Sequence, residues 1–314
     1  MSSTLVGRDL LSIADLSAQE VAGVLDLACA AKGGAALGRP LEGRALSLIF
    51  QRPSNRTRVS FEVAIQRLGG QPISLFNPEV RLGERESPSD ISRILDRYAD
   101  GIVARLVSHR DLTLIAAAAR SPVINALTDA EHPCQVLADL MTVREALGHV
   151  SGARVTYIGD GNNVCTSWIY GAALCGVDLR VVAPTGYEPS QSVLARGAQL
   201  RSRDTPFVVT DDAPAVLRDT DIVYTDVWTS MGQENEQQRR RMDFAHLQVN
   251  DRLLSLAPPG ARVMHCLPAH RGEEITDSVI DGPQSIVFDQ AENRLWVQMA
   301  LLAQLYAPRA ERVA

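Results

Sequence analysis

Short apolar runs alternate with helix-like patterns along most of the chain. Several runs are apolar at every position, which is typical of central parallel strands covered on both faces by helices. The runs predict strands at Ala45–Phe50, Gly101–Leu106, Val123–Asn125, Arg154–Ile158, Leu179–Ala183, Ile222–Thr225, Arg262–Cys266 and Ile286–Phe288. The periodicity between them predicts helices at Ser17–Ala31, Thr57–Leu68, Ser87–Tyr98, Asp111–Ala119, Gln135–Leu147, Val164–Cys175 and Arg294–Tyr306.

The alternation predicts an α/β protein with right-handed crossovers. A chain of 314 residues is long enough for two domains. The segment Gly148–Gly152 separates a predicted helix from a new strand. We therefore expect two doubly wound parallel-sheet domains with a cleft between them, at residues 1–148 and 149–293. The polar stretch Met231–Arg241 predicts a surface loop.

Composition excludes several classes of protein. The net charge of −6 offers no basic excess to hold nucleic acid. The five cysteines are scattered and form no CxxC pair, which argues against a disulfide framework or a structural zinc site. Because neither a long apolar stretch nor a secretory signal is found, we expect a cytoplasmic protein without a membrane span.

The stretch Ser54-Asn55-Arg56-Thr57-Arg58 lies between a predicted strand and a predicted helix. The first backbone N–H groups of a helix lack internal partners, and the helix dipole favours an anion there. The arginines add forked donors that match phosphate oxygens. The stretch therefore predicts a phosphate site, and a capped helix start with solvated arginines is the alternative interpretation.

Other polar residues lie at the ends of predicted strands in the first half. Arg105 ends an apolar strand, where ligands of open α/β sheets bind. His132 and Gln135 are three residues apart, so one helical turn brings them to the same face. The alternatives are a rim arginine in a salt bridge and a histidine that caps a helix or is satisfied in the core.

The second half offers a different chemistry. Gly159 and Gly161 follow a strand, but the third glycine of a dinucleotide fingerprint and the acidic residue for the ribose are missing, so no nicotinamide cofactor is expected. Asp226 ends an apolar strand, where a carboxylate suits an ammonium group. A helix-capping aspartate is the alternative there, and a small buried hydrophobe is the alternative for Cys266.

Taken together, these segments resemble the aspartate/ornithine carbamoyltransferase family. The resemblance is carried by Ser54–Arg58, His132–Gln135, Asp226–Gly232 and His265–Ala269, in that order along the chain. The Ser-Met-Gly that ends the third segment, the His-Cys-Leu-Pro of the fourth and the tail ending at Arg294 are similar to the ornithine branch. The resemblance extends from about residue 7 to the last helix.

The resemblance implies an activity. The carbamoyl group of carbamoyl phosphate would pass to the δ-amino group of L-ornithine, giving L-citrulline and phosphate. No metal and no organic cofactor is implied. The resemblance also implies a homotrimer, and a C-terminal helix, residues 294–314, that packs back on the first domain.

The resemblance assigns roles to single residues. Those on the phosphate would be Ser54, Asn55, Arg56, Thr57 and Arg105. Those at the carbamoyl group would be His132, Gln135, Cys266 and the backbone carbonyl of Leu267, and Arg294 would contact either the phosphate or the carbamoyl group. Those that hold the α-amino and α-carboxylate groups of ornithine would be Asn163, Asp226, Ser230 and Met231. The catalytic residues among them would be Arg105, His132 and Cys266.

Two features keep the amine acceptor open. Asn55 stands where the family has threonine, and the run Phe76–Glu79 is unusual. The alternatives are a carbamoyltransferase for putrescine, an acylated ornithine or a secondary-metabolite precursor, and a non-catalytic binding paralogue. We further expect Arg58 to hold its loop through Glu84 or Glu86, and a cis bond before Pro268.

Overall fold

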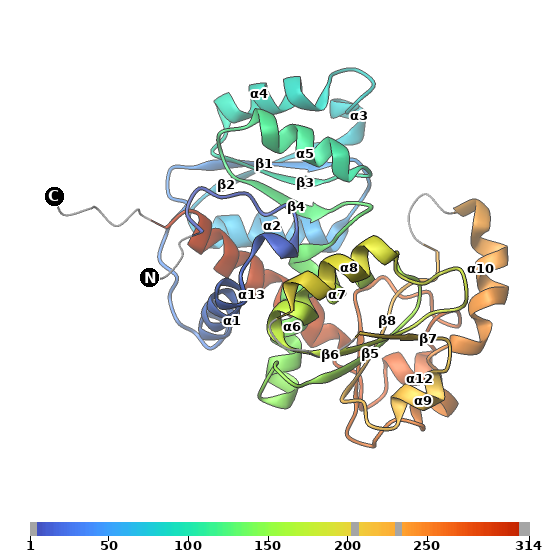
Figure 1. Cartoon of the computed structure of the whole chain (residues 1–314). Helices are drawn as coiled ribbons and strands as arrows, with labels where there is room; N and C mark the ends of the chain where they lie inside the picture. Colours follow the sequence, from blue (N-terminus) through green and yellow to red (C-terminus); the bar gives the residue numbers. More distant parts are fainter. Residues whose placement is uncertain (1–4, 202–206, 230–233, 308–314) are drawn as a thin grey trace. The chain divides into compact units, whose positions relative to one another are not determined.

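The chain forms two α/β units, each built on one parallel sheet (Figure 1). The structure, a computed structural model, describes residues 5–201, 207–229 and 234–307. Unit 1 comprises residues 1–141 and 293–314, and unit 2 comprises residues 142–292. Each division falls within a helix, α6 (Pro133–Leu147) and α13 (Val287–Leu305). The predicted pair of parallel-sheet α/β folds is confirmed.

Unit 1 contains a sheet of strand order β2-β1-β3-β4 in which every pairing is parallel. Its strands are β1 (Ala45–Phe50), β2 (Gln71–Phe76), β3 (Gly101–Arg105) and β4 (Val123–Leu127). Phe50 pairs with Arg105 in the register of β1 and β3. The carboxyl ends of these strands therefore meet at one edge of the sheet, where the predicted phosphate residues follow.

Helices cover both faces of the unit 1 sheet. Helices α4 (Pro88–Tyr98) and α5 (His109–Ala118) lie on one face and α2 (Asn55–Arg67) on the other (Figure 1). The core under α4 and α5 includes Ile49, Ile102 and Ile115. The remaining elements are η1 (Ile13–Asp15), α1 (Ala18–Lys32) and α3 (Asn77–Val80).

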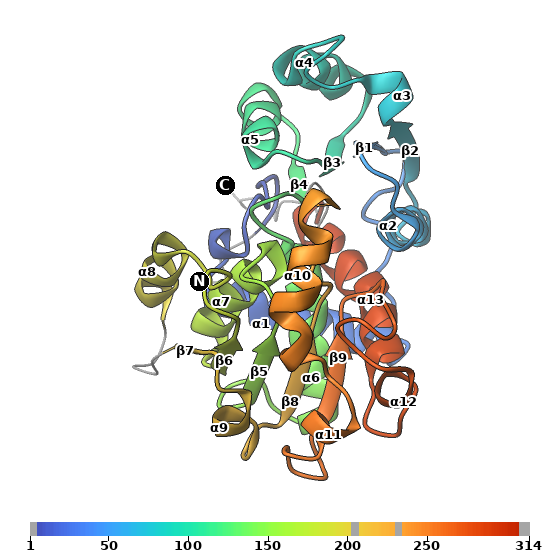
Figure 2. The same cartoon turned by 90° about the vertical axis from the view of Figure 1, so that its right-hand side faces the viewer.

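Unit 2 contains a sheet of strand order β7-β6-β5-β8-β9, again wholly parallel (Figure 2). Its strands are β5 (Arg154–Ile158), β6 (Asp178–Val182), β7 (Val208–Thr210), β8 (Ile222–Thr225) and β9 (Arg262–His265). Its other elements are α7 (Asn163–Cys175), α8 (Gln191–Leu200), α9 (Ala213–Leu217), η2 (Glu234–Glu236), α10 (Gln237–Phe244), η3 (Ala245–Leu247), α11 (Asp251–Leu254) and α12 (Asp277–Ile280). The chain order reverses at β5, so ligands are expected beyond the carboxyl ends of β5 and β8.

Two predictions of secondary structure are wrong. The apolar run Ile286–Phe288 is not a strand, because α13 already begins at Val287. Arg294 consequently lies in the interior of α13 and does not begin the last helix. The polar stretch Met231–Arg241 is not one loop either, because its part from residue 234 onward forms η2 and the start of α10.

Two strands were not predicted from the sequence, β2 and β7. Both lie at an edge of their sheet, where fewer side chains are covered. Within the described ranges, no helix is long and apolar enough to cross a membrane.

Candidate functional site

The start of α2 differs from the other serine-initiated helices. Ser17, Ser87 and Ser108 each precede a helix and accept a hydrogen bond from an N–H of its first turn. Ser54 holds the same position before α2, but its side chain makes no such bond to the described backbone of that helix. The hydroxyl of Ser54 is therefore not used to cap α2, and the first turn of a helix favours an anion, as a phosphate site requires.

Thr57 connects two arginines in the first turn of α2. Its side chain is buried, and its Oγ1 accepts hydrogen bonds from Nη1 of Arg105 at 3.2 Å and Nη2 of Arg294 at 3.1 Å. The shared acceptor lets the guanidinium groups of Arg105 and Arg294 lie near each other despite their like charge. Arg56 precedes Thr57 and is exposed. The cluster is strongly cationic and suits an anion.

A buried chain of hydrogen bonds continues from Arg294. Its Nη1 donates to Oε1 of Gln135 at 2.5 Å, and Nε2 of Gln135 donates to Oδ1 of Asp139 at 2.8 Å. These contacts fix the amide of Gln135 with its oxygen toward Arg294. Asp139 was not predicted from the sequence, although the spacing of four residues from Gln135 on a helix would have suggested the pair.

His132 lies directly before α6 and is buried. Burial, and then the charges of Arg294 and Arg105, hold the pKa of the imidazole well below its ordinary value of 6.5. Each of these causes disfavours the protonated ring. His132 is therefore neutral near pH 7, and a neutral imidazole can still donate one N–H to a ligand oxygen.

The expected partner of Arg58 is wrong. Arg58 pairs with Glu62, one turn further along α2, with Nη1 to Oε2 at 3.2 Å. Oε1 of Glu62 also accepts a hydrogen bond from the hydroxyl of Ser74 at 2.6 Å. Glu62 thus connects α2 to β2, and Arg58 pairs with it within α2. Asn55, the first residue of α2, is exposed.

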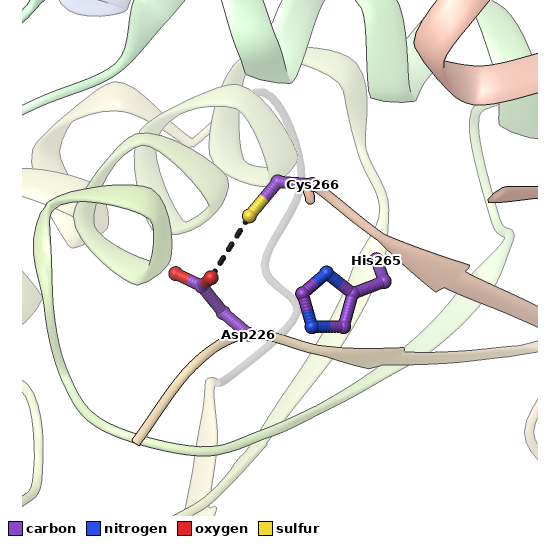
Figure 3. Close-up of side chains that lie close together, drawn as sticks. All are labelled: Asp226, His265 and Cys266. Carbon is purple, nitrogen blue, oxygen red and sulfur yellow. Dashed lines mark hydrogen bonds between the residues drawn. The ribbon is translucent and has the colours of Figure 1, made fainter. Parts of the chain in front are cut away.

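Asp226 is the central acidic residue of unit 2. It follows β8 and is 6% exposed. One carboxylate oxygen accepts from Nδ2 of Asn162 at 2.8 Å, and the other accepts from the Val227 N–H at 2.8 Å and from the Cys266 thiol at 2.9 Å (Figure 3). These donors are neutral, and none of the cationic side chains in the described ranges forms an ion pair with Asp226. It does not cap a helix, so the alternative interpretation is wrong.

Asn162 orients Asp226 and was not predicted from the sequence. It is the N-cap of α7, with Oδ1 accepting from the N–H groups of Val164 and Cys165 and from the hydroxyl of Tyr157. Because its oxygen accepts these bonds, its amide nitrogen is directed at Asp226. An asparagine after a glycine turn and before a helix is a recognisable cap signal. Asn163 follows as the first residue of α7 and is half-buried.

A second acidic residue nearby, Asp160, has its own cation. Nη1 of the buried Arg240 contacts Oδ2 of Asp160 at 2.8 Å and the backbone carbonyl of Trp228 at 3.0 Å. Burial raises the pKa of Asp160, and the guanidinium of Arg240 opposes this effect. Asp160 is neutralised within the protein, which leaves Asp226 as the carboxylate for a ligand. Ser230 and Met231 lie outside the described residues.

The segment after β9 turns sharply. The bond between Leu267 and Pro268 is cis, as predicted, and Leu267 has a left-handed φ of 56°. Cys266 is partly exposed and directs its sulfur at Asp226, whereas the imidazole of His265 lies beside that pair without a hydrogen bond to either residue (Figure 3).

Potential metal-ligand atoms of Asp226, His265 and Cys266 lie within 4.8 Å of one another. Both ring nitrogens of His265 are already engaged, Nδ1 by the N–H of Leu267 and Nε2 by Glu274. The thiol of Cys266 is engaged by Asp226. The donors of this trio are committed to one another and to neighbours, so the arrangement is better suited to holding a turn than to binding an ion.

The structure brings together a subset of the predicted residues in each unit. In unit 1, hydrogen bonds link Arg105, Thr57, Arg294 and Gln135, and the two arginines act electrostatically on His132. In unit 2, Asp226 and Cys266 are directly bonded. The first group is cationic and the second is anionic.

Comparison with known proteins covers both units. The family pattern "Aspartate/ornithine carbamoyltransferase, carbamoyl-P binding domain" matches residues 8–145, and "Aspartate/ornithine carbamoyltransferase, Asp/Orn binding domain" matches residues 151–305. The chain is 51% identical over 302 residues to the ornithine carbamoyltransferase of Thermosynechococcus vestitus, covering 96% of this chain and 97% of the relative. It is 50% identical over 300 residues to that of Acidothermus cellulolyticus, covering 95% and 96%.

Solved structures show the same similarity. The ornithine carbamoyltransferase of Pyrococcus furiosus aligns with a TM-score of 0.93 at 46% identity, covering 98% of this chain and 99% of the other. The anabolic enzyme of Campylobacter jejuni aligns with a TM-score of 0.89 at 33% identity, covering 94% and 97%. On the strength of both patterns and these full-length relatives, the chain belongs to the aspartate/ornithine carbamoyltransferase family.

Proposed function

We propose that this chain transfers the carbamoyl group of carbamoyl phosphate to the δ-amino group of L-ornithine, which yields L-citrulline and phosphate. The observation that carries the proposal is the opposite charge of the two residue clusters. Arginines joined through Thr57 suit a phosphate, and a buried carboxylate with neutral partners suits an ammonium group. Relatives at about half identity bear the name ornithine carbamoyltransferase.

The phosphate group would bind at the start of α2. Ser54, Asn55, Arg56 and Thr57 would supply hydroxyl, amide, guanidinium and backbone N–H donors, and Arg105 would approach from the end of β3. The lack of a side-chain cap at Ser54 supports this role, because its hydroxyl is not used to cap the described helix and the first turn of a helix favours an anion.

The carbamoyl group would be held by neutral and cationic donors. The N–H of His132 and the guanidinium groups of Arg105 and Arg294 would stabilise the carbonyl oxygen as negative charge develops on it. Gln135 and the backbone carbonyl of Leu267 would accept from the carbamoyl NH₂, and Cys266 would lie near the incoming amine. The low pKa of His132 supports this assignment, because the neutral ring persists at physiological pH.

Ornithine would bind through its α-amino and α-carboxylate groups. Asp226 would pair with the ammonium group, and Asn163, Ser230 and Met231 would complete the contacts. The geometry supports this role, because neutral donors from Asn162, Val227 and Cys266 fix the orientation of the Asp226 carboxylate. The negative charge is thereby kept for the substrate.

The reaction requires alignment more than a dedicated base. The neutral δ-amine would attack the carbonyl carbon, a C–N bond would form, and the bond to the phosphate oxygen would break with its electron pair leaving on phosphate. The departing phosphate would take the proton from the new amide nitrogen. The side chains of both clusters would act by holding the reactants and stabilising charge.

We further propose that the protein is a cytoplasmic homotrimer that forms through unit 1. Exposed apolar side chains lie on α2 (Val59) and on the edge strand β2 (Ile73 and Phe76), with exposed fractions of 46%, 40% and 39%. An uncovered apolar edge is a common site of association. Light scattering tests this proposal, and a monomer at working concentration would contradict it.

A different amine acceptor remains the second candidate. Asn55 favours it, since this exposed first residue of α2 differs from the family's threonine. A colorimetric assay for ureido products with ornithine, putrescine and N-acetylornithine separates the two functions. Ornithine as the strongly preferred acceptor supports the proposal, and preference for another amine replaces it with the second candidate. Binding of carbamoyl phosphate without turnover of any amine would indicate a non-catalytic paralogue.

A further inference from the structure

A buried histidine and glutamate in unit 2 lie just outside the residues assigned to the substrates. His265 ends β9, and its side chain and that of Glu274 are both inaccessible to solvent. Nε2 of His265 lies 3.0 Å from Oε1 of Glu274. Buried polar side chains of this kind are costly unless they are fully engaged, so their retention calls for an explanation.

The hydrogen bonds of His265 fix its tautomer. The backbone N–H of Leu267 points at Nδ1 at 2.8 Å, so Nδ1 carries the lone pair. The ring proton therefore resides on Nε2 and is donated to Glu274. The same oxygen of Glu274 accepts from the N–H of His270 at 2.6 Å. Glu274 thus holds both the imidazole and the far end of the turn.

The turn that these contacts hold is strained. Leu267 has a φ of 56°, in the left-handed region that a residue with a branched side chain rarely occupies. Such a conformation persists only where the surroundings over-determine it. The bond from its N–H to His265, two residues earlier, supplies that constraint. The backbone of His265 is itself fixed, because its N–H donates to Oε1 of Gln290 at 2.8 Å.

We propose that His265, oriented by Glu274, is a positioning residue that sets the direction of the Leu267 carbonyl and of the Cys266 thiol. The inference rests on the proposed function in one respect, namely that these groups face the carbamoyl moiety. The φ of Leu267 directs its carbonyl, and the same backbone places the Cys266 sulfur 2.9 Å from Asp226. His265 itself makes no contact with the substrate.

The two amide replacements of His265 test the proposal against a purely structural role. In His265→Asn the side-chain oxygen takes the place of Nδ1 and keeps the acceptor for Leu267. In His265→Gln the side-chain nitrogen takes the place of Nε2 and keeps the donor to Glu274 while the bond to Leu267 is lost. If His265 only stabilises the buried pair with Glu274, His265→Gln should retain more activity than His265→Asn. If His265 positions the turn, His265→Asn should retain more activity than His265→Gln.

The primary measurement is kcat/KM for carbamoyl phosphate in the full-length protein. Displacement of a positioning contact by about 1 Å can cost on the order of 100-fold, so we expect a loss of that size in His265→Gln. His265→Asn should retain activity within roughly tenfold of the unmodified protein. Equal losses in both variants, or a smaller loss in His265→Gln, would overturn the proposal.

A second readout does not depend on turnover. The rate at which iodoacetamide alkylates Cys266, followed by mass spectrometry of its peptide, reports the placement of the thiol directly. We expect a changed rate in His265→Gln and an unchanged rate in His265→Asn, and unchanged rates in both would contradict the proposal. If the unmodified protein forms no product with ornithine, the proposed function fails, while the alkylation rates still decide the role of His265.

Discussion

The candidate sites of the two units carry opposite charges. Unit 1 gathers cations, with Thr57 as an acceptor shared by Arg105 and Arg294 and Gln135 as a further acceptor for Arg294. Unit 2 presents one carboxylate, Asp226, whose partners are all neutral donors. An anionic ligand needs several converging cations, which repel one another unless polar groups separate them. A cationic ligand needs only one carboxylate, provided that its orientation is fixed and its charge is not already neutralised.

The starts of α2 and α7 show the same contrast. Asn162 caps α7 through its side-chain oxygen, and its amide nitrogen is then free to orient Asp226. Ser54 occupies the cap position of α2 without a capping bond within that described helix. The start of α7 is capped and supports Asp226, whereas the start of α2 lacks a side-chain cap and suits an anion. The difference is one of hydrogen bonding and not of fold.

The largest effect is expected from Arg56→Ala. The substitution removes a guanidinium group from the first turn of α2. A charge-assisted contact of this kind contributes about 1.5–3 kcal/mol, which corresponds to roughly 10- to 150-fold in affinity. Turnover should be nearly abolished and the affinity for carbamoyl phosphate lowered. Calorimetric titration with carbamoyl phosphate checks this, with Arg56→Lys as the control that keeps the charge but not the fork. Near-normal affinity in a folded Arg56→Ala protein would remove the phosphate assignment.

A somewhat smaller effect is expected from Thr57→Val. The substitution keeps the shape but removes the acceptor that Arg105 and Arg294 share, at a cost of about 1–3 kcal/mol for the hydrogen bonds that are lost. Both the free energy of unfolding and kcat/KM for carbamoyl phosphate should fall. Thr57→Ser keeps the hydroxyl and should recover most of the loss in urea titrations and in kinetics. An equal loss in both variants would indicate that the methyl group matters and the hydroxyl does not.

Asn162→Asp probes the support of Asp226 in unit 2. Aspartate caps a helix as well as asparagine does, so stability should change little. The new carboxylate would face Oδ2 of Asp226 and replace a donor by a like charge, and we expect the KM for ornithine to rise by roughly fivefold or more. The KM for carbamoyl phosphate should stay nearly constant. A variant with unchanged ornithine kinetics would show that Asn162 serves only as a cap.

The smallest effect is expected in the pH dependence of stability, through His132. Its pKa in the folded protein is lowered well below 6.5, first by burial and then by Arg294 and Arg105. In the unfolded chain the ring takes up a proton as pH falls through its ordinary value, so the contribution to stability is constant above that pH and is lost below it, by up to about 1.4 kcal/mol per pH unit. Urea unfolding at several pH values should show this extra loss relative to His132→Asn. Parallel pH dependence in the two proteins would contradict a neutral His132.

The sequence predicts the fold where burial alone decides the structure. The bounds of β1, β5 and β8 follow directly from their apolar runs. Strand β2 was missed because its side chains alternate between partly covered and exposed positions and it contains a proline. The run at residues 286–288 was wrongly predicted as a strand, because an apolar segment this short does not distinguish a strand from a helix. Only the residues that follow show that α13 begins there.

For the candidate site, the sequence predicts the identity of several residues but few of their contacts. Motif residues such as Thr57, Asp226 and Cys266 could be named from the sequence. The hydrogen bonds of Thr57 to two arginines and of Cys266 to Asp226 could not. Arg240 was assigned to a polar loop because its burial depends on Asp160, which is distant in sequence. By contrast, the pair of Arg58 and Glu62 was within reach of the sequence, because residues four apart on a helix are neighbours.

The kinetics of Asp226→Asn most directly test the proposal that unit 1 binds carbamoyl phosphate and unit 2 binds ornithine. The amide keeps the shape of the side chain and loses the charge that would pair with the ornithine ammonium, a contact worth about 1.5–3 kcal/mol. Both KM values should be measured in the variant and in the unmodified protein. We predict that the KM for ornithine rises at least roughly tenfold, while the KM for carbamoyl phosphate changes by less than about twofold. An equal rise in both values would contradict the account, because Asp226 would then organise the protein instead of binding the amine substrate.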